Sequence, residues 1–147
     1  MTTTTTPRFR FHHVGLAAHA LGDSAAALAA LGIGEDATLA GEIEDPGLGV
    51  RLRFCRGDET GAPRLELVAG LADENPVKRI LARMGPTPYH LCFAVDALDT
   101  ARAHLEAHDF AAVGPPQPAR AFGGRLVQFF RHRDLGLIEL LEQPEDL

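Results

Sequence analysis

The chain has 147 residues, which predicts one domain, and its net charge of −6 disfavours nucleic acid as a partner. No apolar run approaches the roughly 20 residues that cross a bilayer, and the N-terminus lacks the apolar core of a secretory signal. Cys55 and Cys92 stand in apolar stretches that are typical of reduced core residues. We therefore expect a cytoplasmic protein that binds no membrane, with one domain over residues 8–147 and a disordered tail over residues 1–7.

The predicted elements follow the same order twice. In the first half, the strand "FHHVGLAA" precedes the alanine-rich helix "GDSAAALAALG", and the strands "GVRLRFC" and "RLELVAG" come after it. In the second half, "PYHLCFAV" precedes the helix "DTARAHLEAHDF", with "GRLVQFF" and "LIELLEQ" as the later strands. A connector helix is predicted over about residues 73–85. The order predicts two modules, about 8–70 and 87–143, that share one core.

Four polar side chains stand inside otherwise apolar strand stretches. His13 and His90 occupy matching places near the start of each half, and Glu66 and Glu139 lie in the closing strand of each half. Because a buried carboxylate is costly unless it has a partner, these residues are expected to meet. Two imidazoles and two carboxylates can hold a divalent ion and leave positions open for a substrate. The pattern therefore predicts a metal site at His13, Glu66, His90 and Glu139.

The histidines have simpler interpretations when each is taken alone. A single strand histidine is more often a hydrogen-bonded core residue than a ligand, and only the repeated arrangement favours the metal. His12 is expected to point to the face opposite His13, in a rim or packing role, because alternate strand residues face opposite sides. His19, His104, His108 and His132 are expected to be ordinary solvated residues.

These motifs resemble the vicinal oxygen chelate (glyoxalase/bleomycin resistance/dioxygenase) superfamily, and within it the methylmalonyl-CoA epimerases. "HVGLAA" and "YHLCFAVDAL" resemble the two strands that carry the metal histidines, and "LGLIELLE" resembles the closing ligand strand. "LELVAGLADENPVKRILARMG" resembles the first ligand strand with its connector helix. The resemblance implies an α+β fold in which two paired βαβββ modules form a curved mixed sheet around a metal cleft. It also implies a homodimer and a bound cobalt, manganese, nickel or zinc ion.

The implied activity is a metal-dependent epimerase or isomerase that removes a proton next to a carbonyl. The implied substrate is methylmalonyl-CoA or a related acyl thioester, whose enolate the metal stabilises. Glu139 is the expected catalytic base, and Glu44, in the acidic loop with Glu42 and Asp45, is the candidate for the second acid-base group. Some epimerases carry a catalytic carboxylate inside the strand that here contains Leu52.

Two other functions fit the same residues. The first is another metal enzyme of this superfamily, an isomerase, lyase or glyoxalase-like enzyme of specialised metabolism. The second is a metal-free resistance protein that binds a small molecule. Bound metal separates the second function from the enzymes, and hydrogen exchange at the α-carbon of methylmalonyl-CoA separates the epimerase from the other enzymes.

Overall fold

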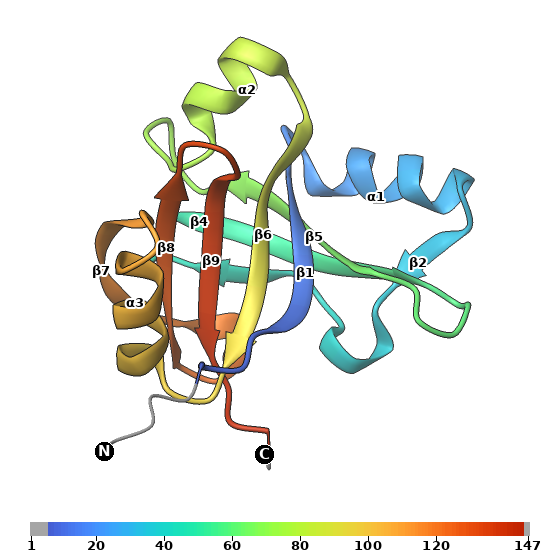
Figure 1. Ribbon diagram of the computed structural model, residues 1–147. Helices are drawn as coiled ribbons and strands as arrows, with labels where there is room; N and C mark the ends of the chain where they lie inside the picture. The colour runs from blue at the N-terminus through green and yellow to red at the C-terminus, as the bar shows by residue number, and fades with distance from the viewer. Residues whose placement is uncertain (1–5, 146–147) are drawn as a thin grey trace, which may run out of the picture.

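One curved sheet runs through both halves of the chain in the computed structural model, which describes residues 6–145 (Figure 1). The first half contains β1 (Arg10–Ala17), α1 (Leu21–Ala30), β2 (Ile33–Glu35), the 3-10 helix η1 (Ala37–Leu39), β3 (Ile43–Asp45), β4 (Val50–Gly57) and β5 (Arg64–Gly70). Helix α2 (Lys78–Met84) connects it to the second half. That half contains β6 (Thr87–Val95), α3 (Leu98–Glu106), β7 (Ala111–Ala119), the 3-10 helix η2 (Arg120–Phe122), β8 (Arg125–His132) and β9 (Gly136–Glu142).

The two halves share one topology. The strand order is β2-β4-β5-β1-β6-β9-β8-β7, with the short β3 paired to β4. Strand β1 pairs in parallel with β5, and β6 pairs in parallel with β9, whereas β1 and β6 pair antiparallel at the seam between the halves. The predicted α+β fold of two βαβββ modules in a curved mixed sheet is therefore confirmed, with β3 as an addition to the first module.

The helices of the two modules cover the outer face of the sheet. Helix α3 packs through Leu98, Ala101 and Leu105 against Ile138 and Leu140 of β9, and α1 packs in the same way against β4 and β5. Since strand residues alternate between faces, the residue between Ile138 and Leu140 must point to the inner face of the sheet. That residue is the predicted ligand Glu139.

The connector helix is shorter than predicted. The side chain of Asn75 accepts a hydrogen bond from the Val77 amide and donates one to the Ala72 carbonyl, which holds the preceding residues in a turn. Helix α2 therefore begins at Lys78, and it ends at Met84, before Gly85, whose φ of 72° suits glycine. No helix in the described part of the chain is long and apolar enough to span a membrane. The predicted tail falls largely on residues 1–5, which lie outside the described residues.

The seam predicts that neither half folds alone. A fragment of residues 1–70 leaves the β1 edge without β6, together with the apolar faces that the second half covers. Modules of about 70 residues have marginal cores even when their apolar faces are covered. We expect the fragment to show no cooperative transition in urea, whereas the full chain shows one. A soluble fragment with dispersed amide resonances and a cooperative transition would contradict this expectation.

Candidate metal centre

The strand pairing brings the four predicted ligands to one place on the inner face of the sheet. In β5, Glu66 lies opposite Gly15 of β1, and in β9, Glu139 lies opposite Cys92 of β6. The seam between β1 and β6 then joins the two pairs, so that each of the four central strands contributes one ligand. All four are buried, with exposed fractions of 0% for His13, 5% for Glu66, 4% for His90 and 4% for Glu139.

The distances within this cluster are those of ligands around one ion. His13 Nε2 lies 3.2 Å from His90 Nε2 and 3.2 Å from Glu139 Oε1. The remaining imidazole–carboxylate distances are 3.4 Å (His13–Glu66), 3.5 Å (His90–Glu66) and 3.4 Å (His90–Glu139). Neighbouring ligands around an ion with bonds of about 2.1 Å stand roughly 3.0–3.4 Å apart. The side chains could therefore hold a single ion, because their donor atoms all lie within 4.8 Å of one another.

The charges of the cluster also suit a cation. Burial raises the pKa of Glu139, but His13 and His90 outweigh burial and hold the pKa below its usual range. Burial lowers the pKa of His13, and Glu66 with Glu139 more than compensate, so that its pKa rises. Glu139 Oε1 meets no hydrogen-bond donor in good geometry although it is buried. Two nitrogens and two carboxylates fit zinc, cobalt, nickel or manganese, and they neutralise the charge of a divalent ion.

The Nδ1 side of the His90 ring is held by packing rather than by a hydrogen bond. Its Nδ1 atom is buried and has no partner. The ring lies against Gly15, where a Cβ would stand 2.0 Å from the His90 Cε1 atom. Tyr89 and Phe129 close its other sides, with ring centroids 4.6 and 5.5 Å away. Gly15 therefore has to be glycine for this ligand to reach the cluster.

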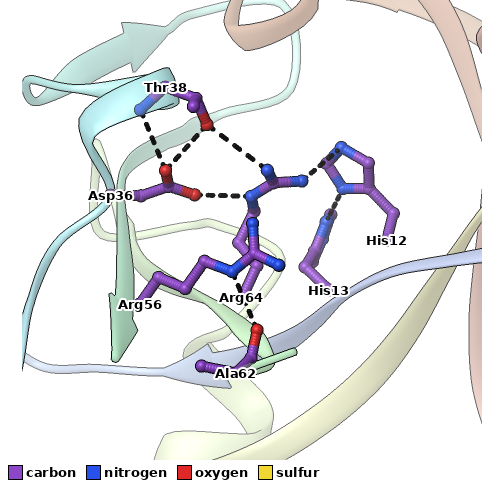
Figure 2. Close-up of polar contacts among 7 residues, drawn as sticks. All are labelled: His12, His13, Asp36, Thr38, Arg56, Ala62 and Arg64. Atoms are coloured by element: carbon purple, nitrogen blue, oxygen red, sulfur yellow. Dashed lines mark hydrogen bonds and ion pairs between the residues drawn. The ribbon is translucent and has the colours of Figure 1, made fainter. Parts of the chain in front are cut away.

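His12 lies beside His13 rather than on the opposite face, which corrects the expectation from strand alternation. The β1–β6 register shifts between Phe11 and His13, so His12 is the extra residue of a bulge, and bulges re-aim side chains. His12 Nδ1 lies 2.7 Å from His13 Nδ1, and Arg64 Nη1 lies 3.1 Å from His12 Nε2 (Figure 2). Burial, His13 and Arg64 together lower the pKa of His12 to about 3, so it is neutral.

Asp36 anchors the far end of this chain of contacts. Its carboxylate accepts hydrogen bonds from Arg64 Nε at 2.5 Å and from the amide and hydroxyl of Thr38 at the start of η1 (Figure 2). Burial raises the pKa of Asp36, but the bonds from Arg64 and Thr38 lower it to about 2. No local sequence pattern predicts this contact, because the aspartate and the arginine are 28 residues apart.

A cavity of about 860 Å³ opens onto the cluster. Glu66, His90 and Glu139 line it together with apolar residues of β4 and β5, which include Leu52 and Val68. Arginines on α2 and β8 also line it: Arg79, Arg83 and Arg131. A small molecule that enters the cavity therefore meets carboxylates and an imidazole at one point, apolar walls, and positive charge.

Glu44, the predicted second acid-base group, is not brought to the cluster. It is exposed on β3, which pairs with β4 only, and it is not among the residues that line the cavity. Glu42 in the same loop is exposed as well. Asp45 is buried, where it accepts hydrogen bonds from the amides of Leu48 and Arg120 and ties the loop to η2. The acidic loop thus has a structural role in this fold.

Comparison with known proteins identifies the class. Residues 12–129 match the Glyoxalase/Bleomycin resistance protein/Dioxygenase superfamily, and the chain belongs to this superfamily. A comparison with curated protein sequences gives no match.

Solved structures with the same fold include methylmalonyl-CoA epimerases. The enzyme from Mycobacterium tuberculosis is 22% identical, with a TM-score of 0.77 over 99% of this chain and 95% of that chain. A methylmalonyl-CoA epimerase in complex with methylmalonyl-CoA and an ammonium ion is 22% identical, with a TM-score of 0.73 over 90% and 93%. A hypothetical protein from Bacillus halodurans C-125 is 21% identical, with a TM-score of 0.76 over 93% and 96%. At these identities the likeness establishes the fold.

The packing of His90 on Gly15 yields a first prediction for the site. Gly15→Ala places a methyl group inside the space of the imidazole, so His90 has to leave the cluster. We expect zinc affinity to fall at least tenfold, as for the loss of one ligand or its orientation. Gly22→Ala on the exposed side of α1 is the matched control, because no atom lies within 4 Å of the added methyl group. Equal zinc affinity in the two variants would refute the assignment of His90.

The ion pair of Asp36 predicts a specific loss of stability in acid. A carboxyl whose pKa is depressed on folding stabilises the fold above its unfolded pKa, and this contribution is lost as the pH falls through the folded value. With the Asp36 pKa at about 2 instead of 3.8, its contribution falls by about 1 kcal/mol between pH 6 and pH 3. Urea unfolding of wild type and Asp36→Asn at both pH values measures this change. A stability difference that stays constant with pH would contradict it.

Proposed function

We propose that the protein is a metal-dependent epimerase or isomerase that removes the proton next to the carbonyl of an acyl thioester of the methylmalonyl-CoA type. The observation that carries this proposal is the buried cluster of two histidines and two glutamates at the end of the cavity. The fold shared with methylmalonyl-CoA epimerases supports the choice of substrate class.

The proposed metal ligands are His13, Glu66, His90 and Glu139, and the ion is cobalt, manganese, nickel or zinc. A bound divalent ion supplies Lewis-acid stabilisation for the negative charge that develops on a carbonyl oxygen when the α-proton leaves. The two carboxylates offset the charge of the ion, and the apolar walls of the cavity exclude water from the reacting carbon.

Glu139 is the proposed base. Its low pKa keeps it ionised, it lines the cavity, and its Oε1 atom has no hydrogen-bond donor in good geometry. A carboxylate in this position can take a proton from a carbon held against the ligand cluster. Glu66 lines the cavity as well and is the alternative carboxylate.

The arginines of the cavity suit the remote part of a thioester substrate. Arg79 and Arg83 on α2 and Arg131 on β8 present guanidinium groups, which bind phosphate groups in a bidentate manner. A CoA-type tail carries such phosphates, and the apolar wall accommodates its acyl end. Remote charge of this kind orients the reacting carbon over the cluster.

The lining of the cavity bears on the stereochemistry. Inversion at a carbon needs a proton donor on the face opposite the base, and the lining includes the apolar side chains of Val50, Leu52 and Val68. Glu66 and Glu139 are the only carboxylates among the described residues that line the cavity. This favours exchange of the α-proton with retention over inversion. The same observation favours a second candidate function, a metal-dependent isomerase or lyase of specialised metabolism that needs a base on one face only.

Deuterium exchange tests the proposal. Metal-loaded protein should exchange the α-proton of methylmalonyl-CoA with D₂O faster than it inverts the centre. Glu139→Gln should lower the exchange rate by roughly 10²–10⁴ because the base is lost, while bound metal is largely retained through the amide oxygen. Glu106→Gln on the exposed face of α3 is the control and should keep the wild-type rate. If the metal-loaded protein exchanges no α-substituted thioester, the epimerase reading is wrong.

A further inference from the structure

A second bulge in the seam turns Tyr89 toward the cavity. The β1–β6 register shifts between Gly15 and Leu16, so Tyr89 is an extra residue on β6, directly before His90. Bulges re-aim side chains, and the ring of Tyr89 packs against the apolar cluster around Leu52 on the inner face of the sheet. Tyr89 and His90 therefore line the same cavity, although they are neighbours on one strand.

The ring of Tyr89 lies beside His90, and its hydroxyl group has no partner. The two ring centroids are 4.6 Å apart, and the ring planes meet at 85°. The hydroxyl oxygen retains some solvent exposure and makes no hydrogen bond with another described residue. A tyrosine hydroxyl in the interior of a protein usually has a hydrogen-bond partner. This hydroxyl is therefore available to a molecule in the cavity.

The other hydrogen-bond donors of the cavity come from elements farther along the chain. Tyr89 carries the only hydroxyl group among the described residues that line it. The lining glutamines are on β7 and β8, and the amide of Gln128 already donates to the Gly114 carbonyl. The lining arginines project from α2 and β8. Tyr89 is thus the neutral donor that stands next to a residue of the cluster.

The proposed reaction needs a donor at this place. When the α-proton leaves, negative charge develops on the carbonyl oxygen of the substrate, and donors aimed at that oxygen lower the barrier. A phenol carries its hydrogen in its ordinary neutral form and can donate it directly. A hydrogen bond to a charged oxygen is roughly twice as strong as one to a neutral oxygen. Such a contact stabilises the enolate more than the substrate, which raises the rate.

We propose that Tyr89 is a catalytic residue whose hydroxyl group donates a hydrogen bond to an oxygen atom of the substrate as the enolate forms. This inference rests on the proposed function, because it needs an enolate at the cluster. The roles are then divided: Glu139 takes the α-proton, and Tyr89 binds an oxygen on which the charge develops. The contact between the rings of Tyr89 and His90 is separate from this role, because it does not involve the hydroxyl group.

One variant and two ligands test the inference. Tyr89→Phe removes a single oxygen atom and keeps the ring against His90. The ligands are 2-nitronate-propionyl-CoA, a planar anion that resembles an enolate, and propionyl-CoA, whose acyl group is uncharged. In zinc-loaded protein, we expect the variant to bind the nitronate roughly 10- to 100-fold more weakly than wild type, as for a lost bond to a charged group. The loss of affinity for propionyl-CoA should be much smaller.

Two results of this comparison would refute the inference. The first is an equal change in affinity for the two ligands, or no change for either. The second is weaker zinc binding by Tyr89→Phe with unchanged binding of the nitronate, which would show that Tyr89 only supports His90. The proposal requires equal zinc affinity in variant and wild type.

The wild-type protein provides a direct measurement, because Tyr89 is the only tyrosine of the chain. Protein labelled with ¹³C at the tyrosine Cζ atom therefore gives one NMR signal, whose position responds to the hydrogen bond of the phenol. We expect the nitronate to move this signal further than propionyl-CoA does. A signal that stays in place when the nitronate saturates the protein would overturn the inference. This measurement also decides the question if Tyr89→Phe does not fold.

The same measurements separate this inference from the proposed function. If wild type binds the nitronate and exchanges the α-proton, and Tyr89→Phe does both equally well, the proposed function stands and the inference fails. If zinc-loaded wild type binds no nitronate thioester and exchanges no α-proton, the proposed function fails and the inference fails with it.

Discussion

The burial of two carboxylates at the seam of the sheet is the constraint on which the site depends. Glu66 and Glu139 sit on the inner face, each less than a tenth exposed, within 3.5 Å of two imidazole nitrogens. Such charges are stable inside a protein only with partners of opposite charge or a cation. In each module the closing strand pairs in parallel with the opening strand, β5 with β1 and β9 with β6. This pairing places one histidine near one glutamate in each module and so provides those partners. The antiparallel seam then joins the two pairs.

The repeat made the four cluster residues predictable from the sequence. The positions of His12 and Arg64 were not predictable, because they depend on a bulge and on tertiary packing. Residues that break an apolar strand identified His13, His90 and both glutamates, and the repeated order of elements predicted the modules. The contact of His12 with His13 was not predicted, because a bulge interrupts the alternation of side chains between the two faces of the strand. The role of Arg64 was not predicted, because its contact with His12 depends on tertiary packing.

The acidic loop shows where sequence chemistry and placement in the fold differ. Glu44 has the right chemistry for a second acid-base group. However, β3 pairs with the edge of β4 that is not paired to β5, and Glu44 is exposed there. A sequence shows which side chains have the necessary chemistry, whereas the pairing of short strands decides which of them reach the cavity. The lining of the cavity includes Leu52 beside the cluster. A cavity in which the cluster supplies the only carboxylates of the described lining is suited to chemistry on a single face of the substrate.

The metal content of the purified protein tests the central claim most directly. Protein made without a chelating tag and equilibrated with zinc, cobalt, nickel or manganese should hold about one ion per chain. His90→Ala combined with Glu139→Ala removes one nitrogen and one carboxylate from the cluster, and the ion should be lost while circular dichroism shows a folded chain. Retention of a full equivalent of metal by this double variant, or no metal in the wild type, would contradict the account.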